Sequence, residues 1–322
     1  MLPAEPSPRN EGTAHPLIDA VAHDPRLRRK TFQGETATVA SVPLRFNERV
    51  DRLLKQRDSL LCVGLDPDPA KYPRPIARMA AGRRHRAFLD GIVRATRPYA
   101  AAYKMQLGAF LQFGAEGIEE LGRLVRSIGP DRIKILDLKA NDIPNTMRLY
   151  HAGIIRGLRF DAMTVSPWLG WESFGPLLDD PAHGFFVVAH SSNPGAPDFQ
   201  EIPTPRGPLW QAVVGEVREL AHRGGNAGVV IGATYPEAIR QGREILGNGV
   251  PILVPGVGAQ GGALSATVRD GVDARGRGLL VSASRSILYA AAGEEWARAA
   301  GEEARRLATQ VNQLRSGVGR GR

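Results

Sequence analysis

Short apolar runs recur along the chain from about residue 59, and each is followed by a stretch that can form a helix. The eight runs are Leu60 to Leu65, Ala101 to Met105, Ile133 to Leu138, Ala162 to Val165, Phe185 to Ala189, Val229 to Gly232, Ile252 to Val254, and Leu279 to Ser282. A spacing of roughly 20 to 45 residues is typical of strands that alternate with crossover helices in a parallel sheet. Eight such units predict an α/β fold, a (β/α)₈ barrel of the TIM type. An open doubly wound sheet is the alternative, but no Gly-x-Gly-x-x-Gly turn follows the first run.

The two ends of the chain lack this rhythm. Residues 1 to about 43 mix proline, glycine and charge without a sustained period of 2 or 3.6, whereas from about Arg45 apolar residues recur at helical spacing. We therefore expect a flexible N-terminal extension over residues 1–44, a catalytic barrel as a single domain over 45–315, and a basic C-terminal tail over 316–322.

The composition is that of an ordinary globular protein, with 43% hydrophobic and 23% charged residues. Cys62 is the only cysteine and lies in an apolar run, so we expect a buried thiol and no disulfide framework. No stretch approaches the roughly 18 continuous apolar residues of a membrane span, and the N-terminus lacks the pattern of a secretion signal. These features predict a cytoplasmic protein with no membrane partner.

The net charge of +9 would suit an acidic partner. The arginine-rich stretches at residues 26–30, 83–86 and 315–322 are scattered, however, and no aromatic residues are interleaved with them. We therefore expect general surface charge and no nucleic-acid partner. Attraction of an anionic metabolite remains the second interpretation.

The third apolar run carries the main candidate chemistry. Side chains alternate between the two faces of a strand, so Asp137 and Lys139 share one face at its end. A purely structural ion pair is the alternative, although burying two charges for stability alone is rarely favourable. Asp142 follows in the loop, and Pro144 suits an early helical position. Asp142 could therefore act as a helix cap instead of taking part in chemistry.

Other strand ends add candidates, because the active site of a barrel is built from the C-terminal ends of its strands. Lys104, after the second run, can add a second cation, although a lone lysine there is more often a surface residue with a buried stem. His190 ends the fifth run, but no Gly-x-Ser-x-Gly elbow and no acid to orient it is apparent, so we interpret it as structural. No clustered histidine pattern marks a metal site.

The last two units predict a phosphate site. The seventh run is followed by a glycine-rich stretch from Gly256 to Gly262, and Arg285 follows the eighth run. Glycine backbone and an arginine at these two consecutive positions are the usual construction of a phosphate site in a barrel. Turn glycines beside a surface arginine are the alternative.

With these motifs in place, the sequence resembles the orotidine 5′-phosphate decarboxylase family, and specifically its bacterial type 2 branch. The matching stretches run in order along most of the chain: Val63-Gly-Leu-Asp-Pro67, Tyr103-Lys-Met-Gln106, Asp137-Leu-Lys-Ala-Asn-Asp-Ile-Pro-Asn-Thr146, Val165-Ser-Pro-Trp-Leu-Gly170, His190-Ser-Ser-Asn-Pro-Gly195, Leu253-Val-Pro-Gly-Val-Gly258 and Ser282-Ala-Ser-Arg285. Type 2 members often carry a basic residue and a glycine where this chain has Ala140 and Asn141. This departure lies between the matched positions.

The resemblance implies a cofactor-free homodimer that converts orotidine 5′-monophosphate to UMP and CO₂ in de novo pyrimidine biosynthesis. The implied array of alternating charges is Lys104, Asp137, Lys139 and Asp142, with Lys139 as the proton donor. The implied substrate contacts are Asp66 and Lys104 on the ribose, Ser191 and Ser192 facing the pyrimidine, Gln260, the glycine backbone near Gly258 and Arg285 on the phosphate, and Asp142 with Thr146 reaching into the neighbouring subunit's site.

The chemistry of this reaction asks for such residues. Loss of CO₂ leaves a ring carbanion that no carbonyl is placed to delocalise, so the site must stabilise the charge and protonate it promptly. A lysine held charged by flanking carboxylates can do both. Two rivals predict other behaviour: a sugar-phosphate lyase that uses a similar segment to hold Mg²⁺, and a non-catalytic basic protein that binds RNA or phosphorylated ligands.

Overall fold

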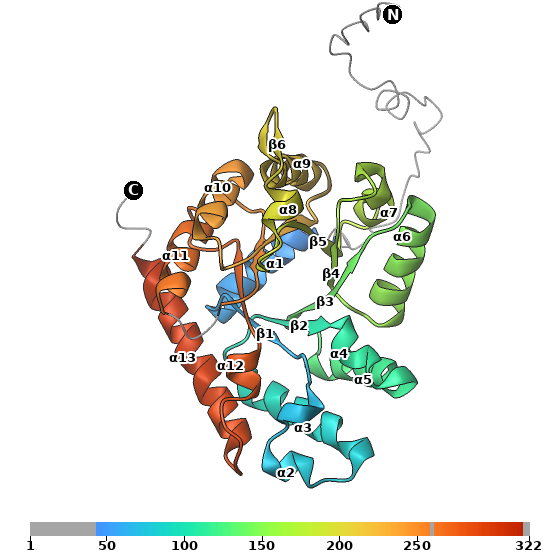
Figure 1. The fold of residues 1–322 in the computed structure, drawn as a ribbon, viewed down its shortest axis with the longest axis vertical. Helices are drawn as coiled ribbons and strands as arrows, with labels where there is room; N and C mark the ends of the chain where they lie inside the picture. Colours follow the sequence, from blue (N-terminus) through green and yellow to red (C-terminus); the bar gives the residue numbers. More distant parts are fainter. Residues whose placement is uncertain (1–42, 258–260, 318–322) are drawn as a thin grey trace, which may run out of the picture. The chain divides into compact units, whose positions relative to one another are not determined.

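The computed structural model describes residues 43–257 and 261–317, and within them eight parallel strands close into a barrel (Figure 1). The strands are β1 (Leu61–Gly64), β2 (Ala102–Gln106), β3 (Ile133–Ala140), β4 (Ala162–Val165), β5 (Gly184–His190), β8 (Ala227–Ile231), β9 (Ile252–Val254) and β10 (Leu279–Ala283). The predicted (β/α)₈ barrel is confirmed. Residues 1–42 of the proposed extension, most of the basic tail, Gly258 and Gln260 lie outside the described residues, and the domain boundaries stay a prediction.

The strand order around the barrel is β1-β10-β9-β8-β5-β4-β3-β2. Pairing of Leu61 with Val281 joins the first strand to the last and closes the ring. Strand β5 pairs directly with β8, because β6 (Pro203–Thr204) and β7 (Gly207–Pro208) form a separate antiparallel hairpin in the connection between them. Each barrel strand agrees with a predicted apolar run to within two residues at either end.

Helices surround the ring of strands (Figure 1). The helices are α1 (Phe46–Arg57), α2 (Arg74–Ala77), α3 (Ala81–Thr96), α4 (Leu107–Leu111), α5 (Gly114–Ile128), α6 (Pro144–His151), α7 (Gly175–Leu178), α8 (Pro197–Gln200), α9 (Leu209–Gly224), α10 (Pro236–Leu246), α11 (Gly261–Gly271), α12 (Arg285–Leu288) and α13 (Trp296–Ser316). In α5 the buried Leu121, Leu124, Val125 and Ile128 follow helical spacing, so one face packs on the barrel. Gly129 ends that helix with a φ of 78°.

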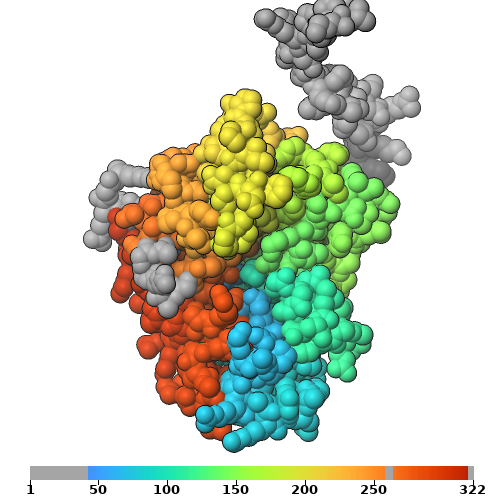
Figure 2. All heavy atoms as spheres, viewed as in Figure 1, coloured from blue at the N-terminus to red at the C-terminus, as the bar shows by residue number. Residues whose placement is uncertain are grey.

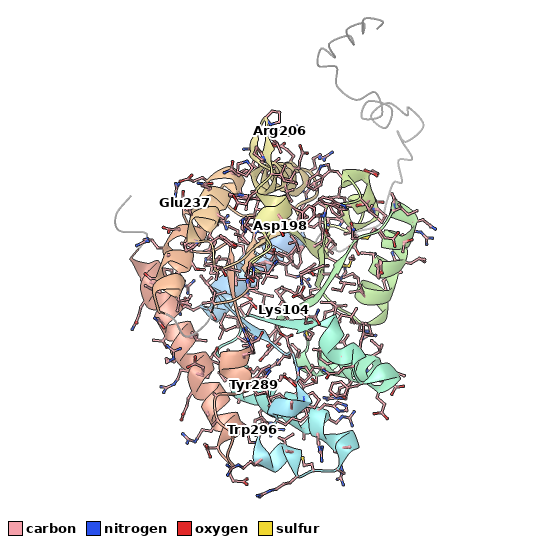
Figure 3. All side chains as sticks on the ribbon, in the orientation of Figure 1. Lys104, Asp198, Arg206, Glu237, Tyr289 and Trp296 are labelled. Carbon is pink, nitrogen blue, oxygen red and sulfur yellow. The ribbon has the colours of Figure 1, made fainter. Side chains whose placement is uncertain are left out.

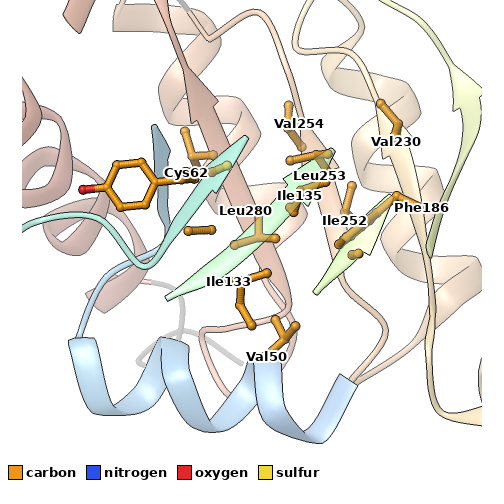
Figure 4. Close-up of a cluster of buried hydrophobic side chains, with 14 of the residues drawn as sticks. Val50, Cys62, Ile133, Ile135, Phe186, Val230, Ile252, Leu253, Val254 and Leu280 are labelled. Carbon is orange, nitrogen blue, oxygen red and sulfur yellow. The ribbon is translucent and has the colours of Figure 1, made fainter. Parts of the chain in front are cut away.

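Helix α1 closes the end of the barrel at which the strands begin. Its Val50 side chain points toward Ile133, the first residue of β3, in the close-up of the core (Figure 4). Phe46 packs edge-on against Phe186 at 6.0 Å between ring centres, and the Asn47 amide donates to the carbonyl of Ala227. With one end closed, chemistry is confined to the opposite end, where the strands finish.

The barrel core is apolar, and the expected burial of the Cys62 thiol is confirmed. Burial raises the pKa of this thiol to about 12, so it stays protonated at neutral pH. In the two described ranges no helix combines the length and apolar character that crossing a membrane requires.

Candidate active site

A cavity of about 630 Å³ opens at the C-terminal ends of the strands. Its lining comes from the loops after β1, β9 and β10 and from the end of β2, and includes Asp66, Lys104, Gly256, Ser284 and Arg285. Lys104 lies near the centre of the ring of strands (Figure 3), and the blue, blue-green and orange-red segments that supply the lining meet on the same face of the molecule (Figure 2). Residues far apart in the sequence thus meet where the barrel fold places active sites.

Two lysines bind the carboxylate of Asp137, one to each oxygen. Nζ of Lys139 lies 2.7 Å from Oδ1, and Nζ of Lys104 lies 3.1 Å from Oδ2. Lys104 also lies 3.7 Å from Oδ2 of Asp66, so it sits between two carboxylates. The expected meeting of Lys104, Asp137 and Lys139 is present in the structure.

Asp137 and Lys104 keep their charges at neutral pH. Burial on its own would raise the pKa of Asp137, but the charges and hydrogen bonds of Lys104 and Lys139 outweigh it and lower this pKa to about 2. Burial would likewise lower the pKa of Lys104, yet Asp66 and Asp137 raise it above its usual value. The Lys104 side chain is only 6% exposed, whereas that of Lys139 is 50% exposed. Lys139 is therefore the more exposed cation of the array, whereas Lys104 lines the cavity.

Asp66 is fixed by three neighbours. Its Oδ1 accepts the backbone N–H of Gln106 at 3.0 Å, and its Oδ2 accepts the Ser284 hydroxyl at 3.0 Å as well as facing Lys104. A β-carbon at position 64 would lie 1.8 Å from the Ser284 hydroxyl oxygen, so Gly64 is needed for this approach. The carboxylate is only partly buried and faces the cavity.

Asp142 and Thr146 lie apart from this network. In the described ranges, no ion pair includes Asp142, whose Oδ1 accepts the backbone N–H of Ile143 at 2.9 Å. The alternative of Asp142 as a helix cap is wrong, because the cap position of α6 is Ile143 and no side chain caps it. Pro144 does begin the helix, as expected, and Thr146 follows in its first turn.

The two candidate pyrimidine-facing serines differ in their surroundings. The Ser191 hydroxyl donates to Oδ1 of Asn193 at 2.7 Å and accepts the Gln200 amide at 2.9 Å. Ser192 lies beside the cavity wall. Gly256 lines the cavity, and a β-carbon added to it would be 3.7 Å from the β-carbon of Ser192. Of the pair, Ser192 is better placed to reach a ligand in the cavity.

The two halves of the expected phosphate site line one cavity. Gly256, with a φ of 86°, and Val257 follow β9, and the exposed Arg285 follows β10. The predicted convergence of the glycine-rich loop and the arginine is therefore present up to residue 257. Gly258 and Gln260 fall outside the described residues.

His190 has an acidic partner that was not apparent in the sequence. Its Nε2 lies 2.7 Å from Oε1 of Glu201, and its Nδ1 lies 3.2 Å from the carbonyl of Ser191. The ring is fully buried between Trp210 and Tyr235. Both ring nitrogens have hydrogen-bond partners, which agrees with the interpretation of His190 as a structural residue.

Three further residues complete the site, and none of them was assigned a role from the sequence. The Thr164 hydroxyl donates to Oδ1 of Asp137 at 2.9 Å, and Ser284 binds Asp66. The Tyr289 hydroxyl accepts the backbone N–H of Asp68 at 2.8 Å and lines the cavity. A polar residue inside an apolar strand was the available signal for Thr164. Nothing in the local sequence marked Tyr289.

An eight-stranded parallel barrel with charged groups at the C-terminal strand ends defines a (β/α)₈-barrel enzyme. A model of the Orotidine 5′-phosphate decarboxylase / HUMPS family matches residues 59–300. The chain belongs to this family.

Individual relatives agree with the family match. Proteins named orotidine 5′-phosphate decarboxylase from Ralstonia nicotianae and Thermomicrobium roseum are 38% and 39% identical to this chain; each alignment covers 85% of the chain, and 100% and 97% of the respective relative. The solved structure of Leishmania donovani OMP decarboxylase is 31% identical, with a TM-score of 0.73 over 85% of this chain and 99% of that one. The relatives indicate an orotidine 5′-phosphate decarboxylase, a carboxy-lyase, and a role in pyrimidine biosynthesis follows from the family.

Proposed function

We propose that this protein converts orotidine 5′-monophosphate to UMP and CO₂ without a cofactor, using the array of Lys104, Asp137 and Lys139. One observation carries the proposal: a half-exposed lysine is held by a carboxylate that a second, buried lysine also binds. The array adjoins a cavity that also contains glycine backbone and Arg285, groups suited to a phosphate. Cytoplasmic location stays a prediction.

In this mechanism Lys139 is the general acid. Its ammonium stabilises the carbanion that forms as CO₂ leaves, and then protonates the same carbon. Asp137 close to the substrate carboxylate adds repulsion that vanishes as CO₂ departs, about 4 kcal/mol for unit charges at 4 Å and an effective dielectric near 20. Enzymes commonly lower barriers by about 8 to 23 kcal/mol, so binding of the distant phosphate must supply much of the remainder.

The substrate's other groups have candidate partners around the array. Asp66 and Lys104 are placed to bind ribose hydroxyls, because both line the cavity beside the array. Ser192, with Ser191 behind it, faces the pyrimidine. Arg285 binds the phosphate together with Gln260 and the backbone near Gly258.

We propose further that the protein is a homodimer in which Asp142 and Thr146 complete the partner's site. Asp142 makes no ion pair in the described part of its own chain, which leaves its charge available to another subunit. The side chains around it favour burial at an interface, since Ile143 is 57% exposed and Leu149 on α6 is 56% exposed.

The Mg²⁺-dependent lyase fits the site less well. Both oxygens of Asp137 are bound by ammonium groups, and a divalent cation there would face two positive charges at close range. This arrangement favours the decarboxylase, in which the same ammonium groups stabilise developing negative charge.

Replacing Lys139 tests its assigned role. Lys139→Ala should lower turnover of orotidine 5′-monophosphate by at least about 10²- to 10⁴-fold, the usual contribution of a general acid, while UMP binding stays largely intact. Lys55→Ala is the control, because Lys55 is an exposed lysine on α1 at the opposite end of the barrel. A Lys139→Ala protein with full turnover would refute the proton-donor role.

A further inference from the structure

Strand β3 leaves regular pairing with β4 at the point where its charged residues lie. Leu136 pairs with Met163, but the next pair in register is Ala140 with Val165, so β3 contains extra residues that β4 does not match. Within this bulge Lys139 has a φ of 53°, a left-handed conformation that residues other than glycine seldom adopt. Such backbone persists only where neighbouring groups hold it.

The hydroxyl of Thr164, on β4, holds this bulge. Oγ1 accepts the backbone N–H of Leu138 at 3.1 Å and that of Lys139 at 2.9 Å, and it donates its proton to Oδ1 of Asp137 at 2.9 Å. A hydroxyl has one proton and two acceptor lone pairs, so all three are used. Thr164 is buried, with 1% exposure, and these three hydrogen bonds fix the orientation of its hydroxyl.

Thr164 therefore controls Lys139 in two ways. It binds the Lys139 backbone directly, and it orients the Asp137 oxygen that lies 2.7 Å from the Lys139 ammonium. A valine at this position would have nearly the same shape but could neither donate nor accept. Two backbone N–H groups would then lack their partner, and the carboxylate would lose its neutral donor.

We propose that Thr164 is a positioning residue for the decarboxylation: its hydroxyl fixes the β3 bulge and the Asp137 carboxylate so that Lys139 points to the reacting carbon. This inference rests on the proposed function and adds to it a residue that acts through Asp137 and Lys139.

The test compares kcat and KM for orotidine 5′-monophosphate, and affinity for UMP, in matched variants. Thr164→Val should lower kcat about 10- to 100-fold, the effect of losing a hydrogen bond to a charged group, while KM and UMP affinity change less than about threefold. Thr164→Ser keeps the hydroxyl and should stay within about threefold of wild-type kcat. Thr267→Val is the control, because this buried threonine on α11 has a hydroxyl without a partner among the described residues. It should keep wild-type kcat.

Three results would overturn the inference. The first is a folded Thr164→Val enzyme with wild-type kcat, and the second is a serine variant as slow as the valine variant. If circular dichroism shows that Thr164→Val does not fold, Thr164→Cys takes its place. Its thiol is a weak donor and acceptor, so its kcat should fall below that of the serine variant. The third contradicting result is a kcat of Thr164→Cys equal to that of the serine variant. Wild-type protein that fails to turn over the substrate would instead refute the proposed function, and the inference with it.

Discussion

Asp137 links the two lysines of the site, and its charge makes stability depend on pH. Its pKa is about 2 in the folded protein against an ordinary value of 3.8, because the two lysines outweigh the effect of burial. A carboxyl with a lowered pKa stabilises the fold above its unfolded pKa, and this contribution is lost as pH falls through the folded pKa. The shift corresponds to about 2 kcal/mol for this mostly buried group.

We therefore expect the difference in free energy of unfolding between wild type and Asp137→Asn to shrink by about 2 kcal/mol as pH falls from about 4 to about 2. Urea unfolding followed by circular dichroism at several pH values measures it. Asp198→Asn, which removes an exposed carboxylate, should follow wild type over the same range. A difference in free energy of unfolding between wild type and Asp137→Asn that is the same at about pH 5 and at about pH 2 would contradict the ion-pair assignment.

At the scale of single residues, strand periodicity and the barrel rule were enough to predict that Lys104, Asp137 and Lys139 converge. Periodicity could not predict the left-handed backbone at Lys139, because that conformation depends on the hydroxyl of Thr164 from the next strand. The Glu201 partner of His190 was hidden for a similar reason. It lies in the connection after α8, where no regular pattern fixes the direction of a side chain.

At the scale of elements, one buried arginine ties α10 to three neighbouring segments. Arg243 is 8% exposed, and its guanidinium donates to four backbone carbonyls, those of Gly247, Val250, Gly271 and Gly278. Burial lowers its pKa to about 10, so it still carries its charge at neutral pH. These four carbonyls lie around the starts of β9 and β10, at the end of the barrel opposite the active site.

Arg243→Met should lower the free energy of unfolding by about 3 to 5 kcal/mol, because it leaves buried carbonyls without donors. Arg240→Met is the matched control on the same helix. Arg240 is exposed and binds Glu237 and Glu244 at the surface, so its loss should change stability little. Chemical unfolding of both variants tests the claim, and equal stability of the two would contradict it. At temperatures well below unfolding, both should retain wild-type activity.

Element positions were predictable where apolar runs were short and bounded, and this covers all eight barrel strands. The irregular pieces were not predicted. The β6–β7 hairpin and the four-residue helices α7 and α8 are too short to show a period, and they form because their ends are fixed by the barrel. The π-helical turn at Ala152–Gly157 continues α6 without any break in the sequence pattern.

At the scale of the whole molecule, the proposed dimer predicts complementation between two inactive variants. In a heterodimer of Lys139→Ala and Asp142→Ala chains, one site lacks both residues and the other has both. Purified heterodimer carrying two different tags should therefore show about half the wild-type turnover per dimer, while each variant alone stays inactive.

The control pairs Lys139→Ala with a chain that carries both substitutions. Neither site of that heterodimer is intact, so it should stay inactive. Absence of recovery in the first heterodimer would show that Asp142 serves its own subunit. Subunit exchange during the assay can be checked by purifying the heterodimer a second time.

The most direct test of the account is turnover by metal-free protein. Purified enzyme dialysed against EDTA is mixed with orotidine 5′-monophosphate, and the loss of substrate absorbance is followed together with release of CO₂. We expect full activity without added metal, because Lys139 and Lys104 supply the positive charge at the reacting carbon. No turnover at micromolar enzyme, or activity that EDTA abolishes and Mg²⁺ restores, would contradict it.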